Sequence, residues 1–279
     1  MKKTPKYHYM DSHVHTDLSH DGKSSIADYL EYAKERSVDE VTYTEHYDVY
    51  DGVDSKLTTL DVMRYWREFL SETMRFETRT NFGIEIGLRP ECEYKIKQMT
   101  DSYRFDFIIG SSHITRGKDM SMDPSFFAGL TMQEAYGEYF KEVRENIDIF
   151  DDFDVYGHLD YVVRYGGYGC KMIKYQDFAK ILDSILEALI KKGKGLELNT
   201  SGYRYGLSCA HPNAEILQRY YDKGGRIITV GSDAHESKYL ASHFDDAYDL
   251  LEKIGFKEIA VFHHREPTFH EIATLKNHA

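Results

Sequence analysis

The sequence predicts one α/β domain, residues 1–279, folded as a parallel β/α barrel, and three observations support this prediction. Apolar runs typical of strands alternate about seven times with amphipathic runs typical of helices. No linker, low-complexity segment or shift in composition divides the chain. Histidine and acidic residues stand at the carboxyl end of nearly every expected strand. In a barrel these ends converge on one site, whereas the alternative, a doubly wound open sheet, would spread them along an edge.

The expected elements follow one another in regular alternation. The strands cover residues 7–14, 40–44, 81–87, 105–111, 153–157, 195–199, 226–230 and 258–262. Two helices begin at sequences typical of a capping box, Ser25-Ile-Ala-Asp28 and Thr131-Met-Gln-Glu134. The first of these is expected to end near residue 36, and further helices are expected over residues 59–76, 175–191, 213–223 and 244–254.

The composition excludes several classes of protein. The formal charge is −12, from 47 acidic and 35 basic residues, which disfavours nucleic-acid binding because phosphates require a basic surface. A small phosphorylated substrate is still compatible with this negative charge, since bound divalent cations would make the local electrostatic field positive. The three cysteines are widely spaced and predict no disulfide framework. Neither a signal peptide nor an apolar stretch of transmembrane length is apparent, so we expect a soluble, cytoplasmic protein with no membrane partner.

Two histidines at the end of the first expected strand indicate a metal site. Residues two apart in an extended chain face the same way, so His13 and His15 present both imidazoles to one side. Such a pair suits zinc, iron or manganese.

Similar residues recur at later strand ends, and they use seven of the 14 histidines. One histidine alone would more often be a core or loop residue, but recurrence at equivalent positions favours a shared site. Nitrogen and carboxylate donors without cysteine are typical of a hydrolytic metal cluster. The candidate ligands are His13, His15, His20, His46, Glu85, His113, His158, Asp233 and His235.

The chain resembles the PHP (polymerase and histidinol phosphatase) family over residues 11–235. The matching motifs are His13-Val-His15, Ser19-His-Asp-Gly22, Thr44-Glu-His46, Gly83-Ile-Glu85, Ile109-Gly-Ser-Ser-His113, Gly157-His-Leu-Asp160 and Gly231-Ser-Asp-Ala-His235. Glu45 departs from the pattern, because aspartate is usual there. Within the family, the sequence is most similar to the monofunctional histidinol-phosphate phosphatases, which also share the segments 157–164 and 197–204.

This resemblance implies a distorted (β/α)7 barrel that holds three divalent metal ions. It assigns His13, His15, Glu85 and Asp233 to the first metal. It assigns His20, His46 and His235 to the second, and His113, His158 and a shared Glu85 to the third. It also implies hydrolysis of a small phosphate monoester, L-histidinol phosphate, to L-histidinol and inorganic phosphate in histidine biosynthesis.

The mechanism expected for this site is direct attack on phosphorus by a metal-bridging hydroxide. Arg164 and Arg204 are the predicted substrate-binding residues, because two guanidinium groups can neutralise the phosphate. Asp233 and His235 are the predicted catalytic residues, and either of them or a metal-bound water would deliver a proton to the leaving alkoxide. Glu45 and Asp160 are expected either to orient ligating imidazoles or to be solvated loop acids.

Two other functions are compatible with the motifs. The same site could serve a phosphoesterase acting on nucleotides or short nucleic acids, although the net charge of −12 and the lack of basic clusters weigh against it. The third hypothesis is a non-catalytic metal-binding or regulatory domain, which the complete ligand set disfavours. Seven histidines are expected to lie outside the site, and His211 is the one of these that could contact substrate. The sequence contains no signal for an oligomeric state.

Overall fold

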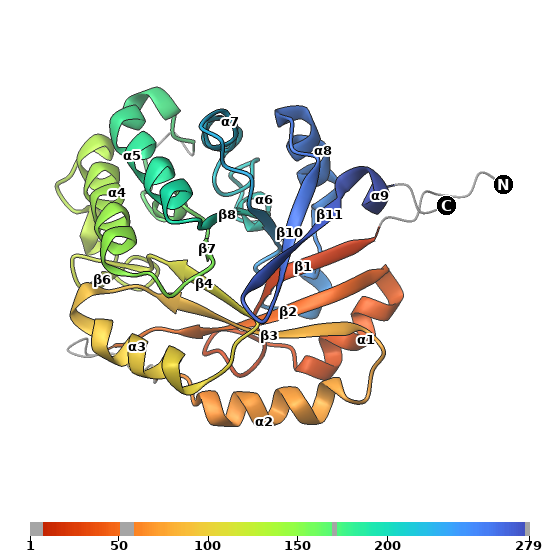
Figure 1. The fold of residues 1–279 in the computed structure, drawn as a ribbon. Helices are drawn as coiled ribbons and strands as arrows, with labels where there is room; N and C mark the ends of the chain where they lie inside the picture. Colours follow the sequence, from red (N-terminus) through yellow and green to blue (C-terminus); the bar gives the residue numbers. More distant parts are fainter. Residues whose placement is uncertain (1–7, 51–58, 169–171, 277–279) are drawn as a thin grey trace.

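The computed structural model describes residues 8–50, 59–168 and 172–276. Seven parallel strands form one sheet in the order in which they occur along the chain. These strands are β1 (Tyr9–Val14), β2 (Val38–Tyr47), β3 (Arg79–Gly87), β4 (Phe107–Ser111), β7 (Val155–Tyr156), β8 (Gly195–Asn199) and β9 (Ile228–Gly231). The first and last strands approach each other through a bridge between Val14 and Ala234, so the sheet curls into a nearly closed barrel (Figure 1). The predicted seven-stranded α/β barrel is confirmed.

Helices surround this sheet (Figure 1). They are α1 (Ile26–Arg36), α2 (Val62–Thr73), α3 (Glu93–Ser102), α4 (Met132–Ile149), α5 (Ala179–Lys191), α6 (Ser201–Arg204), α7 (Ala214–Asp222), α8 (Phe244–Ile254) and α9 (Ile272–Lys276). The short helix α6 follows β8 at the carboxyl end of the barrel. Both expected capping boxes are present, at Ser25 with Asp28 and at Thr131 with Glu134. In each, the hydroxyl and the carboxylate satisfy amides that the first turn leaves free.

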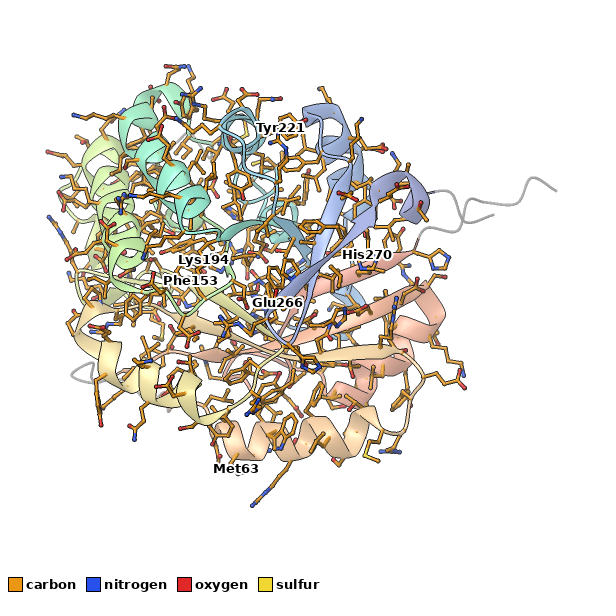
Figure 2. The ribbon with its side chains drawn as sticks, in the orientation of Figure 1. Met63, Phe153, Lys194, Tyr221, Glu266 and His270 are labelled. Carbon is orange, nitrogen blue, oxygen red and sulfur yellow. The ribbon has the colours of Figure 1, made fainter. Side chains whose placement is uncertain are left out.

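Some boundaries differ from the predicted ones for identifiable reasons. Helix α2 is shorter than the predicted range 59–76, because the Asp61 side chain accepts from the Arg64 amide and so caps the helix there. Residues Tyr175–Phe178 form a 3₁₀ turn before α5. Helix α3 was not predicted. Apolar residues on the inner faces of these helices pack against the strands, whereas Met63 on the outer face of α2 points away from the core (Figure 2).

The expected strand 258–262 is a hairpin strand and not an eighth strand of the barrel. It forms β10 (Glu258–His263), which pairs antiparallel with β11 (Glu266–Glu271) in a separate two-stranded sheet. Phe262 stacks on Phe107 at a centroid distance of 5.1 Å, and the hairpin residue Arg265 pairs with Asp154 just before β7. The hairpin therefore covers the amino-terminal ends of β4 and β7, and its residue Glu266 is labelled near the centre of Figure 2.

A second small sheet joins β5 (Ile114–Thr115) to β6 (Lys118–Asp119) directly after β4. In the part of the chain that the structure describes, no helix is long and apolar enough to cross a membrane. With one end of the barrel covered by the hairpin, the carboxyl ends of the strands form the other end, where the predicted site residues lie.

Candidate metal centre

The carboxyl ends of the strands bring the predicted ligands together. In the parallel pairing of β2 with β3, His46 stands opposite Glu85. The loops after β1 and β9 are joined, because the Asp233 amide donates to the His13 carbonyl at 2.7 Å and the His15 amide donates to the Ala234 carbonyl at 2.8 Å. Strand register and these two bonds therefore set the backbone positions of the site.

Glu85 lies at the centre of the histidine cluster and is fully buried. Its two carboxylate oxygens lie 2.8–3.5 Å from nitrogens of five imidazole rings, those of His13, His15, His46, His113 and His158. Burial opposes ionisation of this carboxyl, but the imidazoles, beginning with His113 and His13, hold its pKa well below the usual range. The centre is thus arranged around a negative charge that positive charge must balance.

Among the residues that the structure describes, four sets of three side chains have donor atoms within 4.8 Å of one another. They are His13, His15 and Asp233; His15, His46 and His235; His13, Glu85 and His158; and His46, Asp48 and His113. His13, His15 and His46 each belong to two sets, so neighbouring sets share side chains. Such overlap is the arrangement that a cluster of neighbouring metal ions requires, in contrast to isolated sites.

The groups differ from the predicted ones in the places of His113 and His20. His113 is grouped with His46 and Asp48, and not with His158 and Glu85. The structure puts His15 beside His46 and His235, with the His15 and His46 rings stacked at a centroid distance of 3.9 Å. The His20 ring lies 5.6 Å from that of His46, is one-third exposed, and belongs to none of the four sets. Its role as a ligand stays a prediction.

The donor atoms fit divalent metal ions. The Nε2 atoms of His13 and His15 face each other at 3.0 Å, and the His15 ring is buried. Burial and the neighbouring His46 hold the pKa of His15 well below its usual value, so the ring is neutral, the form that binds metals. Among the described residues, His15 Nδ1, Glu85 Oε2 and His158 Nδ1 are buried without a hydrogen-bond partner. Buried polar atoms without partners are costly, and a cation bound at Glu85 Oε2 would remove part of that cost.

Two carboxylates that the sequence analysis did not select hold ligand rings in place. Glu197 Oε1 lies 2.6 Å from His13 Nδ1, and Asp48 Oδ1 lies 3.0 Å from His113 Nδ1. Since a carboxylate only accepts, each ring carries a proton on Nδ1, and Nε2 is the atom that faces the centre and would bind a metal ion. The signal for Glu197 was its alternation with Asn199 in a strand, which places both side chains on one face.

Replacing Glu197 with glutamine is expected to weaken metal binding or activity by about 10-fold to 100-fold. The amide group can donate to His13 Nδ1, which would move the ring proton to Nε2 and block that donor atom. Competition of the purified variant with a chelator of known affinity measures the effect. Glu187→Gln, at an exposed position that pairs with Lys223, is the matched control. Equal metal affinity in both variants would remove Glu197 from the centre.

The expectation that Glu45 orients a ligating imidazole is wrong. Its buried carboxylate accepts from the Thr16 amide at 3.0 Å, from the Thr16 hydroxyl at 2.7 Å and from the Ser19 hydroxyl at 2.5 Å. The Ser19 hydroxyl in turn accepts from the His46 amide at 3.0 Å. Glu45 therefore shapes the loop after β1. Asp160 does hold an imidazole, but that of His211, which is not a predicted ligand.

Arg164, in the 3₁₀ helix η3 (Tyr161–Arg164), is buried beside Asp233. Its Nη2 donates to Asp233 Oδ2 at 2.9 Å and also to the Ser201 hydroxyl. The guanidinium lies over the ring of Tyr205 at 4.3 Å, in cation–π geometry. Burial opposes ionisation of Asp233, but Arg164, followed by His13, holds its pKa well below the usual range. A fixed positive charge thus borders the donor cluster.

The Arg204 side chain contacts the backbone of the loop that carries Asp233. Its Nη2 donates to the Asp233 carbonyl at 2.7 Å, and its Nη1 donates to the Ser242 hydroxyl at 3.0 Å. Asp233 has a φ of 52°, a left-handed conformation that is uncommon for a residue other than glycine. The contacts of Arg204 therefore stabilise the conformation that directs the Asp233 carboxylate into the site. Its predicted contact with substrate stays a prediction.

His235 lies at the edge of the cluster, between Asp233 and Asp21. Its Nδ1 lies 3.0 Å from the Asp233 carbonyl, and its Nε2 lies 3.0 Å from Asp21 Oδ2. Asp21 follows His20 in the loop after β1 and was not predicted as a site residue. Burial opposes its ionisation, but His46 and His235 hold the pKa of this carboxyl below its usual value.

Three comparisons relate the chain to known proteins. The family model described as "PHP domain" matches residues 11–201. A histidinol-phosphatase of Lactococcus lactis subsp. lactis (strain IL1403) is 31% identical over 258 residues, which are 91% of this chain and 94% of that protein.

The crystal structure of histidinol phosphate phosphatase from the same organism, in complex with zinc, L-histidinol and phosphate, superposes with a TM-score of 0.84. It is 29% identical and covers 95% of this chain and all of that one. A crystal structure of a Listeria monocytogenes protein superposes with a TM-score of 0.74 over 85% of this chain and 99% of that one. At 17% identity it shows the shared fold alone.

Proposed function

Because the chain belongs to the PHP domain family, we propose that it is a metal-dependent phosphatase that hydrolyses L-histidinol phosphate to L-histidinol and inorganic phosphate. The observation that carries this proposal is a buried cluster of histidine and carboxylate donors bordered by the buried guanidinium of Arg164. The similar Lactococcus lactis enzyme was crystallised with zinc, L-histidinol and phosphate. The enzyme would then act in histidine biosynthesis, which implies a cytoplasmic location.

We propose that the metal ions are held by the eight predicted ligands that make up the overlapping sets described above, joined by Asp48, with His20 as a further ligand. Divalent ions bound there would act as Lewis acids toward the phosphoryl oxygens and would make water a stronger nucleophile at neutral pH. Zinc, iron and manganese all accept these donors. Glu85, which contacts five rings, would be the carboxylate shared between ions.

The side chains around the cluster supply binding and proton handling. Within the described residues, the hydrogen bonds of the Arg164 guanidinium use Nε and Nη2, which leaves Nη1 to donate to a phosphoryl oxygen. The catalytic residues proposed for the leaving group are Asp233 and His235. His235 Nδ1 lies 3.6 Å from Asp233 Oδ1, so a proton on this nitrogen would lie next to the Asp233 carboxylate, and the pair could deliver it to an ester oxygen bound beside them.

The competing function is hydrolysis of nucleotides or short nucleic acids by the same centre. Long polyanions need a basic surface, and the net charge of −12 opposes their approach. A terminal phosphate on a small molecule needs no more than the metal ions and one or two guanidinium groups. The charge therefore favours a small phosphate monoester.

A substrate panel tests the proposed function. Metal-loaded protein is offered L-histidinol phosphate, a nucleoside monophosphate, a phosphodiester and short single-stranded DNA, and product formation is measured. We expect turnover of L-histidinol phosphate above all others, and its loss after treatment with a chelator, since the bound metal ions would supply the activated nucleophile. Re-addition of zinc or manganese is the control that restores activity. Faster product formation from the diester or the nucleotide than from L-histidinol phosphate would refute the proposal.

A further inference from the structure

His211 lies in the loop after α6, at a position that the metal cluster does not include. Its side chain is buried between Asp160 and Arg164, which are buried themselves. His211 Nδ1 lies 2.5 Å from Asp160 Oδ1, and Arg164 Nε donates to His211 Nε2 at 3.2 Å. The three side chains form a line that ends at the guanidinium beside Asp233.

The backbone fixes the position of the His211 ring. Asn199, the last residue of β8, donates to the His211 carbonyl at 2.7 Å and accepts from the His211 amide at 2.8 Å. Asp160 is held in turn, because its Oδ2 accepts from the Asn213 amide at 3.3 Å. His211 is therefore tied to the end of a barrel strand, and its carboxylate partner is tied to the start of α7.

These contacts allow one protonation pattern for the ring. A carboxylate only accepts, so the His211 Nδ1 that faces Asp160 carries a proton. The Arg164 Nε–H only donates, so the opposite nitrogen must offer its lone pair. The ring is then a neutral imidazole in a single tautomer, selected by Asp160 and directed at the guanidinium.

We propose that His211 is a positioning residue that orients Arg164 for binding the phosphate group of the substrate. The inference rests on the proposed function, which gives Arg164 its ligand. A guanidinium is planar, so holding Nε by His211 and Nη2 by Asp233 sets the plane and the direction of Nη1. Tyr205, from the same loop, covers one face of that plane. The loop 205–212 thus supplies both the cover and the acceptor.

A variant that moves the His211 proton from Nδ1 to Nε2, and keeps the imidazole ring, tests this role. In Asp160→Asn, the side-chain oxygen can still accept from the Asn213 amide, and the new amide group then donates to His211 Nδ1. The ring proton moves to Nε2, where it faces the Arg164 Nε–H. We expect the affinity for inorganic phosphate to fall by about 10-fold to 100-fold, the range for losing a hydrogen bond to a charged group.

A second pair of variants covers the case in which Asp160→Asn does not fold. His211→Gln can place its Oε1 near the position of Nε2 and keep an acceptor for Arg164, whereas His211→Ala cannot. We expect His211→Gln to recover most of the phosphate affinity that His211→Ala loses. In kinetics, KM for L-histidinol phosphate should rise more than kcat falls, because binding of the phosphate is weakened in the ground state as well.

The readouts are the inhibition or calorimetric constants of inorganic phosphate and of L-histidinol, together with bound metal and thermal stability. An orienting role changes the phosphate constant and leaves the L-histidinol constant and metal content near those of the wild type. Equal losses for both ligands, or equal phosphate affinities in His211→Gln and His211→Ala, would overturn the inference. Failure of the wild type to hydrolyse L-histidinol phosphate would refute the proposed function, while phosphate titrations of the variants would still decide the role of His211.

Discussion

Replacing Glu85 with glutamine is expected to lower kcat/KM for L-histidinol phosphate by about 1,000-fold or more. The carboxylate contacts five imidazoles and is the shared ligand proposed for neighbouring metal ions. Losing one ion removes several kcal/mol of charge stabilisation in the transition state, and about 1.4 kcal/mol corresponds to a tenfold change in rate. Steady-state kinetics and elemental analysis of the same preparation measure the two effects, and we expect activity and bound metal to fall together.

Glu40→Gln is the matched control for this variant. Glu40 is as fully buried as Glu85 and lies in the neighbouring strand β2, but it faces the amino-terminal end of the barrel, where it accepts from the Asn81 side chain at 2.6 Å. We expect this variant to lose stability and to keep its metal content and most of its kcat/KM. If Glu85→Gln kept full metal content and more than a tenth of the wild-type kcat/KM, its central role would be refuted.

Replacing Asp233 with asparagine is expected to have an effect of similar size, about 1,000-fold in kcat/KM, because it affects both metal and phosphate binding. One carboxylate oxygen lies 3.4 Å from His15 Nε2, and the other accepts from Arg164 at 2.9 Å. Asparagine removes the charge and keeps the shape, and it tolerates the left-handed φ of 52° better than alanine does. Kinetics, bound metal and phosphate affinity should all decline.

The matched control for this second variant is another buried aspartate paired with an arginine. Asp154 accepts from Arg265 at 2.6 Å at the amino-terminal end of the barrel, far from the strand ends that carry the site. Asp154→Asn breaks an equivalent pair, so we expect lower thermal stability with little change in kcat/KM. A similar loss of activity in both variants would mean that Asp233 acts through folding alone.

Local sequence signals predicted most of the fold. Hydroxyl and acidic residues three apart marked the starts of α1 and α4, and apolar runs marked all seven barrel strands, because capping and burial act over a few neighbouring residues. The strand 258–262 was recognised as a strand but not as part of a hairpin. Pairing between β10 and β11 depends on contacts that a local pattern does not contain.

The candidate site, like the fold, was predicted in part from local sequence signals. Nine candidate ligands could be selected from the sequence because each stands at or near a strand end. The sequence could not predict that His15, and not His20, is grouped with His46 and His235. The sequence singled out His211 only as a possible substrate contact and Glu197 only as part of a shared motif, because a local pattern does not show that their side chains contact Arg164 and His13.

The sequence by itself determined which residues reach the carboxyl end of the barrel, because parallel β/α units bring the ends of successive strands together whatever helices join them. The tertiary structure alone decided which donors share a set, which carboxylate selects the protonated nitrogen of each ring, and how Arg164 is oriented. The physical reason is one of scale. Hydrogen bonds and metal ligation require atomic positions within a few tenths of an ångström, and strand register, loop paths and side-chain packing set those positions across residues distant in the chain.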